Sequence, residues 1–361
     1  MNILILTYQG DTAGSTNSIA YLAKGLADKG HNVYVGCRKE SLLFNMLTGS
    51  RVNLCPMTFR SKLDLKNVRQ IRDVVKRHHI QIINAQSSKD RYTSIFAKWL
   101  FGLKVKVVHT RRQKPESIGG FLQNWLYVKG TDKIVAVSNG VKKFLVAQKI
   151  PQNHIEVIYN GTPRQKYEAV DLKRSEELKK KYNILDGDFV IGCVSRKKSQ
   201  DQLLRALHYV PFKTKVIFVG IEKYSEYQER LEALENKHII YFTGIVSNSE
   251  VLNYYPLFTV KILPSSMEGL SQSILEAMAL GVPVIATDAA GNPDIIKHQE
   301  NGFLFKDNDP EQLANEIIAL HDHPQKRQKL IENGRKTAFE TFSIEKTIHN
   351  YERFFHSLLE N

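Results

Sequence analysis

The sequence has few cysteines and no long apolar run, and both absences limit what the protein is. Its three cysteines, Cys37, Cys55 and Cys193, are far apart, and none belongs to a Cys-x-x-Cys or Cys/His ligand spacing. Neither a disulfide framework nor a zinc site is therefore indicated. No apolar stretch approaches the roughly 18 residues of a membrane-spanning helix, and no small-residue cleavage site follows the short first strand. We expect a cytoplasmic protein.

The composition is that of an ordinary globular protein, but the charge is unevenly distributed. The 361 residues are 42% hydrophobic and 24% charged, and they carry a net charge of +14. Residues 1–163 contain 25 Lys and Arg against 9 Asp and Glu, whereas residues 164–361 contain 26 against 28. The basic half predicts an anionic partner, either phospholipid, a phosphorylated acceptor or nucleic acid. No helix-turn-helix, RNP-type aromatic pattern or zinc finger supports nucleic acid.

Short apolar strands alternate with amphipathic helices in both halves of the chain. The front half has predicted strands at 2–8, 32–37, 81–84, 105–109 and 133–137, and a helix at 18–29. After an irregular stretch the alternation restarts, with strands at 189–194, 215–219, 239–242, 261–263, 282–287 and 302–305 and helices at 200–210 and 225–236. This pattern predicts an α/β protein with two doubly wound parallel sheets.

We expect an N-terminal domain of residues 1–165, a second domain of 166–342 and a final helix, 343–361, that packs back on the first domain. Residues 181–188 are predicted to lie near the hinge. Ligands of such sheets bind beyond the carboxyl ends of the strands. The active site is therefore expected in the cleft between the two domains.

Two carboxylates, Glu268 and Glu276, flank a small polar segment that leads into an apolar helix. The helix is predicted to begin near Ser271, with Ser271 or Ser273 as its cap, and to stop at Gly281. Its N-terminus is suited to an anion. A carboxylate one turn further in is suited to accepting hydrogen bonds from a diol. A phosphate site between two carboxylates that bind hydroxyl groups matches a nucleoside diphosphate sugar, which has a ribose on one side of the phosphates and a sugar on the other.

The neighbouring segments resemble the retaining GT-B glycosyltransferases of family 4. Glu268-x7-Glu276 is followed by Ala277-Met-Ala-Leu-Gly-Val-Pro-Val-Ile-Ala-Thr-Asp288 and Gly291-Asn-Pro-Asp294, without a gap. Further segments stand where the family has similar ones: Val137-Ser-Asn-Gly140, Val157-Ile-Tyr-Asn-Gly161, Gly244-Ile-Val246 with Ser249-Glu250, and Asn301-Gly-Phe-Leu304. The resemblance covers the whole chain, and its motifs are most specific in the second half.

The resemblance implies a donor site in the second domain. Arg196 and Lys198 would neutralise the donor diphosphate as negative charge develops on it, which needs no metal. The loop that holds them is about three residues shorter than the usual pattern, so Lys197 is the alternative lysine. Glu268 would face the transferred sugar and Glu276 the ribose. The remaining donor contacts would come from Gly269, Leu270, Ser271, Val246 and, from the first domain, Gly14.

In the first half the resemblance is looser. Ser15 and Thr16 begin the first helix and would touch the acceptor or phosphate. The family's usual His after the fourth of the predicted front strands, residues 105–109, is matched either by His109 or, aligned by the strand, by Arg112. An Arg there favours an acidic or phosphorylated sugar or acceptor. Lys89 and Asp90, in a segment similar to one of lipopolysaccharide-type members, are further acceptor candidates.

A basic amphipathic segment, residues 62–79, suggests contact with an anionic membrane. Its apolar stripe is Leu65, Val68, Ile71 and Val75, and residues 98–106 add further basic and aromatic side chains. The alternative is an ordinary helix that buries the stripe against the sheet and leaves the basic face in solvent.

We therefore predict a retaining glycosyltransferase that moves a sugar from a UDP- or GDP-sugar to a glycan or lipid-linked acceptor in bacterial cell-surface polysaccharide or lipopolysaccharide biosynthesis. No acidic pair occupies a metal-binding loop, so no metal or other cofactor is expected. The competing interpretations are a non-catalytic GT-B-like subunit and a nucleotide-sugar 2-epimerase. A nicotinamide-dependent dehydrogenase is disfavoured, because the first loop lacks Gly-x-Gly-x-x-Gly and no acid ends the second strand.

Overall fold

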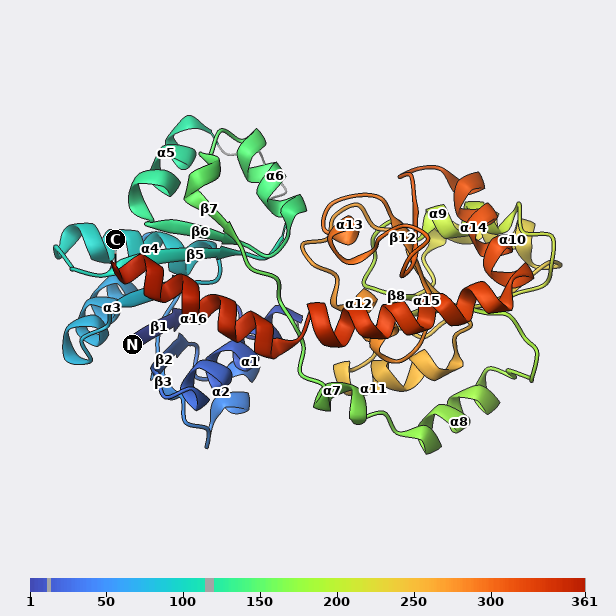
Figure 1. Ribbon diagram of the computed structural model, residues 1–361, viewed down its shortest axis with the longest axis horizontal. Coiled ribbons are helices and arrows are strands. Elements are labelled where there is room, and N and C mark those ends of the chain that lie inside the picture. The colour runs from blue at the N-terminus through green and yellow to red at the C-terminus, as the bar shows by residue number, and fades with distance from the viewer. Residues whose placement is uncertain (12–13, 114–119, 361) are drawn as a thin grey trace. The chain divides into compact units, whose positions relative to one another are not determined.

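The computed structural model describes residues 1–11, 14–113 and 120–360, and it divides the chain into two compact units (Figure 1). The first unit contains Met1–Pro163 together with the last segment, Ser343–Asn361, and the second contains Arg164–Phe342. Residues 181–188, predicted near a hinge, lie instead inside the second unit, between helix α8 (Leu172–Lys181) and strand β8 (Val190–Val194). The Asp-Gly turn in this segment reverses the chain within the unit.

The first unit is built on a seven-stranded parallel sheet with the order β3-β2-β1-β4-β5-β6-β7. Its strands are β1 (Asn2–Leu6), β2 (Asn32–Cys37), β3 (Asn53–Pro56), β4 (Ile82–Ala85), β5 (Lys106–Arg111), β6 (Lys133–Ala136) and β7 (Ile155–Val157). The strand order reverses between β1 and β4, so the loops after these strands open the site expected for a ligand. The sequence had not indicated β3 or β7, which are short edge elements.

Helices of the first unit cover the two faces of its sheet. They are α1 (Gly14–Asp28), α2 (Leu42–Leu47), α3 (Leu65–Arg77), α4 (Ser88–Leu100), α5 (Phe121–Gly130), α6 (Asn139–Ala147) and the C-terminal α16 (Ile344–Glu360). Helix α1 begins four residues earlier than its apolar pattern predicts. Val68, Ile71 and Val75 of α3 are buried in the core while Leu65 is exposed, so most of the stripe suggested for a membrane belongs to the core.

The C-terminal helix α16 is part of the first unit and packs on α1. A Cβ atom at Gly25 would come within 2.0 Å of Ile348 Cδ1, so this close approach requires glycine. Glu352 Oε1 lies 3.0 Å from His31 Nε2, and Lys29 contacts the other carboxylate oxygen. Buried Tyr351 reaches β5, where its hydroxyl lies 3.2 Å from Thr110 Oγ1. The two ends of the chain therefore share one hydrophobic core.

The second unit has a six-stranded parallel sheet with the order β10-β9-β8-β11-β12-β13, which reverses between β8 and β11. Its other strands are β9 (Lys215–Val219), β10 (Ile239–Phe242), β11 (Val260–Leu263), β12 (Val284–Thr287) and β13 (Phe303–Phe305). Its other helices are α7 (Gln165–Glu168), α9 (Asp201–Leu207), α10 (Gln228–Leu234), α11 (Asn248–Val251), α12 (Gln272–Ala279), α13 (Asn292–Ile295), α14 (Pro310–Asp322) and α15 (Pro324–Lys336).

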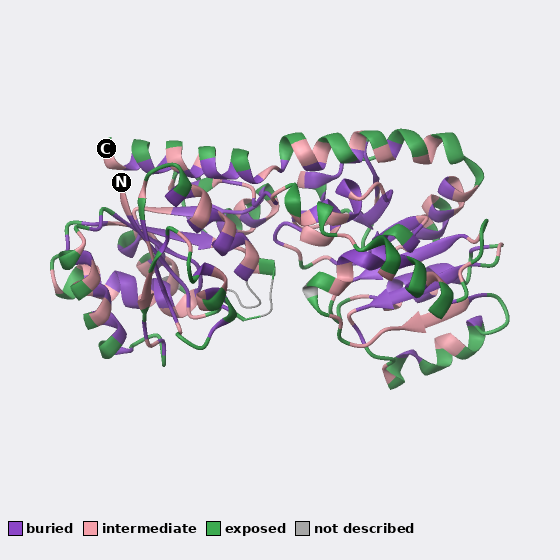
Figure 2. Ribbon diagram, turned by 90° about the horizontal axis from the view of Figure 1, so that it is seen from below, coloured by how far each residue is buried: buried purple, intermediate pink, exposed green. Residues whose placement is uncertain are grey.

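Buried residues follow the strands of each unit, and exposed residues lie on the outer faces of the helices (Figure 2). This distribution is expected for parallel sheets that are covered on both faces. Within the described residues, no helix is long and apolar enough to cross a membrane.

Candidate functional site

The loops at the carboxyl edge of the second sheet are tied together around Glu268. Asn292, buried after β12, donates from Nδ2 to the carbonyl oxygens of Ser265 and Thr287, at 3.1 and 3.0 Å. The amide of Gly291 donates to the backbone oxygen of Glu268 at 3.3 Å. The Gly-Asn-Pro-Asp segment therefore fixes the loop after β11, and with it the direction of the Glu268 side chain.

Glu268 is brought together with Lys198, as their assignment to one site predicts. The two side chains form an ion pair, with 14% and 29% of their surfaces exposed. Buried Gln200 braces the short loop after β8: its Oε1 accepts from the Lys198 amide at 2.7 Å, and its Nε2 donates to Ser195 Oγ and to the Arg196 carbonyl. Gln200 carries no motif signal, because its role is seen only once the loop is folded.

The other two basic residues of this loop differ in their surroundings. Lys197 Nζ lies 2.9 Å from Glu226 Oε2 and 4.1 Å from the centroid of the Tyr224 ring. Arg196 is exposed at the same edge of the sheet. Lys198, not Lys197, is thus the lysine in contact with Glu268.

Helix α12 starts beside this pair. Ser271 is its N-cap residue, Gly269, Leu270 and Ser271 are buried, and the helix ends at Gly281 with a φ of 77°, the left-handed conformation that favours glycine. The Ser271 side chain makes no capping hydrogen bond and instead lies 3.2 Å from Ser273 Oγ. The N-terminus of α12 is therefore ready for an anion rather than closed by its own cap.

Glu276, just beyond the first turn of α12, is held by two residues that the sequence did not identify. Lys166 Nζ lies 2.5 Å from one carboxylate oxygen, and the buried Tyr255 hydroxyl donates to the other at 2.8 Å. Lys166 is 110 positions away, in the short helix α7 before α8. Burial and the Glu276 charge raise the pKa of Tyr255, so the phenol remains a donor. No local pattern could have found this arrangement.

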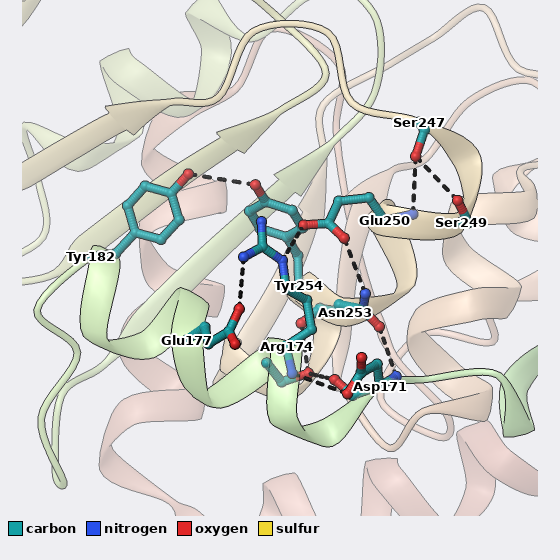
Figure 3. Close-up of polar contacts among 10 residues, drawn as sticks. Asp171, Arg174, Glu177, Tyr182, Ser247, Ser249, Glu250, Asn253 and Tyr254 are labelled. Carbon is teal, nitrogen blue, oxygen red and sulfur yellow. Dashed lines mark hydrogen bonds and ion pairs between the residues drawn. The ribbon is translucent and has the colours of Figure 1, made fainter.

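The turn that contains Val246 is anchored from outside the sheet. Gly244 has a φ of 70°, and Val246 is half-buried. Figure 3 shows Glu250, which follows the turn, accepting from Arg174 Nε of α8 at 2.7 Å and from Asn253 Nδ2 at 3.2 Å. Asn253 in turn accepts from the Asp171 amide. Helix α8 therefore fixes the turn, and Glu250 has a structural role.

At the carboxyl edge of the first sheet, the predicted residues after β1 are largely covered. Thr16 is buried, and its hydroxyl donates to the Asp11 carbonyl at 2.6 Å. Ser15 is half-buried, and Gly14 is exposed at the start of α1. The Thr16 hydroxyl therefore donates within the loop, and its contact with an acceptor stays a prediction. In the same loop the backbone at Gly10 packs closely on Ser41, because a Cβ atom at Gly10 would lie 2.9 Å from Ser41 Cβ.

His109 is buried at the end of β5 and does not face solvent. Its Nδ1 lies 3.1 Å from the Ala85 carbonyl oxygen, so this nitrogen carries the proton, and Nε2 accepts from Arg91 Nη1 at 3.1 Å. The buried Arg91 guanidinium lies 3.6 Å from the centroid of the Tyr127 ring. Burial and the charges of Arg91 and Arg111 lower the pKa of His109 well below its ordinary value. His109 is therefore a neutral structural residue at physiological pH.

Arg112 instead leaves donors unused. Its Nε and Nη2 donate to Gln86 Oε1 at 3.0 and 2.8 Å. Arg112 Nη1 and Gln86 Nε2 are buried and have no hydrogen-bond partner among the described residues, which exclude 114–119. Burial lowers the pKa of the guanidinium, which still remains charged. Two unpartnered buried donors at one place are expected to meet an acceptor atom of a ligand.

Asp90 and Lys89, at the start of α4, hold the loop before them. The fully buried Asp90 carboxylate accepts from the amides of Gln86, Ser87 and Tyr8 and from Ser87 Oγ, at 2.7, 2.8, 3.3 and 2.6 Å. Burial raises its pKa, while these hydrogen bonds act in the opposite direction. Lys89 donates to the Phe59 carbonyl. Asp90 therefore holds the loop in this structure, and the acceptor contact expected from the sequence stays a prediction.

No cluster of three or more His, Cys, Asp or Glu side chains that could bind a metal ion occurs in the part of the chain that the structure describes.

Comparisons with known proteins agree with the predicted family and fold. The family "Glycosyl transferases group 1" matches residues 173–337, and "Glycosyltransferase Family 4" matches residues 12–166. The chain is 24% identical over 363 residues to N-acetyl-alpha-D-glucosaminyl L-malate synthase of Bacillus anthracis, covering 94% of this chain and 93% of that protein. It is 24% identical over 315 residues to the capsular polysaccharide biosynthesis glycosyltransferase CapM of Staphylococcus aureus, covering 82% of each.

Among solved structures, Anabaena HepE in complex with UDP-glucose superimposes with a TM-score of 0.82 at 20% identity, covering 99% of this chain and all of that one. A glycosyltransferase from Rickettsia africae gives a TM-score of 0.83 at 22% identity, with 100% and 99% coverage. These likenesses confirm the two-sheet GT-B fold predicted from the sequence.

Proposed function

Because this chain belongs to the family 4 glycosyltransferases, glycosyl transferases group 1, we propose that it transfers a sugar from a nucleoside diphosphate sugar to a hydroxyl group with retention of anomeric configuration. The observation that carries the proposal is the carboxyl edge of the second sheet, where Lys198, Glu268 and Glu276 surround the N-terminus of α12. The anion-binding helix end would take the diphosphate, and the two acids would read hydroxyl groups on either side of it.

Arg196 and Lys198 would stabilise the leaving diphosphate. As the bond between the sugar C1 and the phosphate oxygen breaks, negative charge grows on that oxygen, and fixed cations lower the barrier most at that moment. Lys198 is favoured over Lys197 because Lys198 contacts Glu268, whereas Lys197 pairs with Glu226. Glu268, already in contact with Lys198, would accept from hydroxyls of the transferred sugar. These two cations would supply the charge that a divalent metal supplies elsewhere, so no metal is needed.

The proposed reaction proceeds on one face of the sugar. The acceptor O–H bond breaks, its proton passes to an oxygen of the departing phosphate, and the acceptor oxygen bonds to C1. The products are the glycosylated acceptor and the nucleoside diphosphate. The protein's part is to orient both reactants and stabilise the departing charge, without a covalent intermediate on a side chain.

Glu276 and Tyr255 favour a ribose in this site. Lys166 and Tyr255 fix the carboxylate, which can still accept from a vicinal diol because a carboxylate has about four acceptor positions. The UDP-glucose bound to HepE supports a uridine donor. GDP-sugars remain the alternative to be tested.

Arg112 and Gln86 favour an anionic group on the acceptor or on the transferred sugar. Their unpartnered donors, Arg112 Nη1 and Gln86 Nε2, suit a carboxylate or phosphate oxygen. The basic first half of the chain adds a favourable field for such a ligand. The relationship to CapM supports an acceptor from a cell-surface polysaccharide.

The proposal is tested with purified protein, EDTA and a panel of UDP-, GDP-, ADP- and dTDP-sugars. Thermal stabilisation by one donor and slow release of its nucleoside diphosphate are expected. Glu276→Gln should weaken that binding by roughly tenfold, because it removes a charged hydrogen-bond acceptor. Stabilisation that requires added metal would contradict the proposed charge stabilisation. Conversion of the donor sugar into its epimer without acceptor would identify an epimerase, and no binding at all would favour a non-catalytic subunit.

A peripheral membrane contact is also proposed, through α4 and α5 of the first unit rather than through α3. Trp99 and Leu100 at the end of α4 and Leu122 and Trp125 of α5 are exposed, and the two indole rings lie 6.1 Å apart. Exposed Lys129 lies one helical turn after Trp125, on the same face of α5. Tryptophan beside lysine suits the interface of an anionic bilayer.

The chain's only two tryptophans are in this patch, so their fluorescence reports on it directly. Vesicles of phosphatidylserine and phosphatidylcholine should shift the emission to the blue, and pure phosphatidylcholine should shift it less. The membrane contact would be rejected if the emission spectrum did not change and if no protein were found with the vesicles after sedimentation.

A further inference from the structure

Lys261 is a fully buried lysine in the middle of the second sheet, and nothing in the sequence pattern marks it. It lies on β11, the strand next to the reversal of strand order, in register with Gly192 of β8 and Val284 of β12. None of its surface is exposed to solvent. Lysines are almost never buried to this extent unless they are paired.

The ammonium group of Lys261 is directed to the N-terminus of α12. Its Nζ donates to Ser273 Oγ at 3.1 Å, and Ser273 Oγ lies 3.2 Å from Ser271 Oγ. Since an ammonium can only donate, Ser273 accepts from it, and its own proton is available to Ser271. The Ser271 hydroxyl, which makes no capping bond, is then left to donate to an anion at the helix end.

The contrast with Lys215 shows what is unusual about Lys261. Lys215 on β9 is also buried, but its Nζ lies 2.7 Å from Asp188 Oδ2. Across the described ranges, no carboxylate lies within ion-pair distance of Lys261. Glu268 and Glu276 are close enough to act on it electrostatically, but each is engaged by another lysine, Lys198 and Lys166.

A buried charge without a partner is costly, and such a cost is typical of a functional site. We propose that Lys261 is a positioning residue of the donor site, which orients the Ser273 and Ser271 hydroxyl groups and places a buried positive charge beneath the diphosphate. This inference rests on the proposed function, because it needs a diphosphate at the N-terminus of α12.

Titration of Lys261 gives the inference a second readout. Burial lowers the pKa of Lys261 to about 8, while the charges of Glu268 and Glu276 act to raise it and that of Lys198 to lower it further. A bound diphosphate adds negative charge and should raise the pKa again. Binding above pH 8 is therefore expected to take up a proton, and affinity should fall as pH rises through this range.

The test compares Lys261→Met with Lys215→Met in the full-length protein. Calorimetric titrations with UDP, uridine and inorganic pyrophosphate at pH 7 and pH 9 measure the affinities, and thermal unfolding without ligand measures stability. Lys261→Met should weaken UDP and pyrophosphate binding by roughly tenfold to a hundredfold, the range for a charged hydrogen bond. It should leave uridine binding unchanged, lose the decline of affinity between pH 7 and pH 9, and raise the thermal midpoint.

Lys215→Met should do the reverse, lowering the thermal midpoint and leaving UDP binding unchanged, because it removes the partner of Asp188. Ser273→Ala keeps the buried charge and should weaken UDP less than Lys261→Met does. Unchanged UDP and pyrophosphate affinity in Lys261→Met would overturn the inference and leave the proposed function intact. A lowered midpoint in Lys261→Met would make Lys261 a structural residue. If the wild type bound neither pyrophosphate nor any nucleoside diphosphate of the donor panel, the proposed function would fail as well.

Discussion

The carboxyl edges of the two sheets carry similar residue types in opposite states. At the edge of the first sheet, Asp90 and His109 are buried, and their polar atoms are satisfied by neighbouring backbone and side chains. At the edge of the second sheet, Lys198, Glu268 and Glu276 keep part of their surface in solvent and form ion pairs with one another or with Lys166. At the first edge the polar side chains hold the loops in place, whereas at the second edge we expect them to contact a ligand as well.

The difference shows why a polar residue at a strand end is a weak sign of function by itself. An acid whose lone pairs are all used internally stabilises a loop, whereas Glu268 and Glu276 are each held by a lysine and keep further acceptor positions for a ligand, because a carboxylate has about four of them. Arg112, with unused donors, is the exception at the first edge.

The largest effect on the transfer rate is expected at Arg196. Its substitution tests whether the loop after β8 is catalytic or only basic. Arg196→Ala should lower the transfer rate by roughly a hundredfold to a thousandfold, with a smaller change in donor affinity, because it removes charge where charge develops. Single-turnover measurements of sugar transfer give the rate.

Lys197→Ala is the matched control for Arg196→Ala. Lys197 is the next residue in the same loop, but it is engaged by Glu226 and Tyr224, so its removal should change the rate by less than about threefold. Equal effects of the two variants would mean that the loop contributes only general positive charge. Full activity of Arg196→Ala would reject its assigned role.

The sequence predicted the two sheets because buried parallel strands are continuous apolar runs. Strands β2, β9 and β10 have the bounds expected from the sequence. β3 was missed because its burial is incomplete and it is set by pairing with β2 rather than by its own pattern. The predicted helix over 225–236 is shorter, since the structure has one turn of 3-10 helix and then α10.

The candidate site was only partly predictable, for a different reason. Glu268 and Glu276 are found from local spacing around one helix, and Lys198 from its place after a strand. Lys166 reaches Glu276 across 110 residues, and Lys261 points into the site from the middle of a strand where an apolar residue is expected. Such contacts depend on how helices and strands pack together, and the hydrophobic periodicity of the sequence does not predict them.

A stability measurement at Asp90 tests the other side of the comparison. Asp90→Asn replaces one acceptor oxygen by an NH2 group, which cannot accept from the amide and hydroxyl donors around it. The free energy of unfolding should therefore fall by about 2 kcal/mol. Urea unfolding measures the loss. Asp171→Asn is the control, since Asp171 caps α8 near the surface and Asn caps almost as well, so a loss below about 0.5 kcal/mol is expected. If the Asp90→Asn variant were stable but no longer transferred the sugar, Asp90 would belong to the substrate site after all.

The smallest effect is expected at His109, and it depends on pH. The pKa of His109 is lowered in the folded protein. His109 in the unfolded chain therefore binds a proton as the pH falls through about 6.5, whereas in the folded protein it stays neutral. The contribution to stability is therefore complete above that pH and is lost as pH falls below it, by at most about 1.4 kcal/mol per pH unit. His109→Gln keeps a donor for Ala85 and an acceptor for Arg91 but does not titrate. The difference in unfolding free energy between wild type and His109→Gln should shift in favour of the variant between pH 7 and pH 5.5, while the transfer rate at pH 7 stays within about threefold of wild type. A large rate loss at neutral pH would instead show that the neutral imidazole takes part in the reaction.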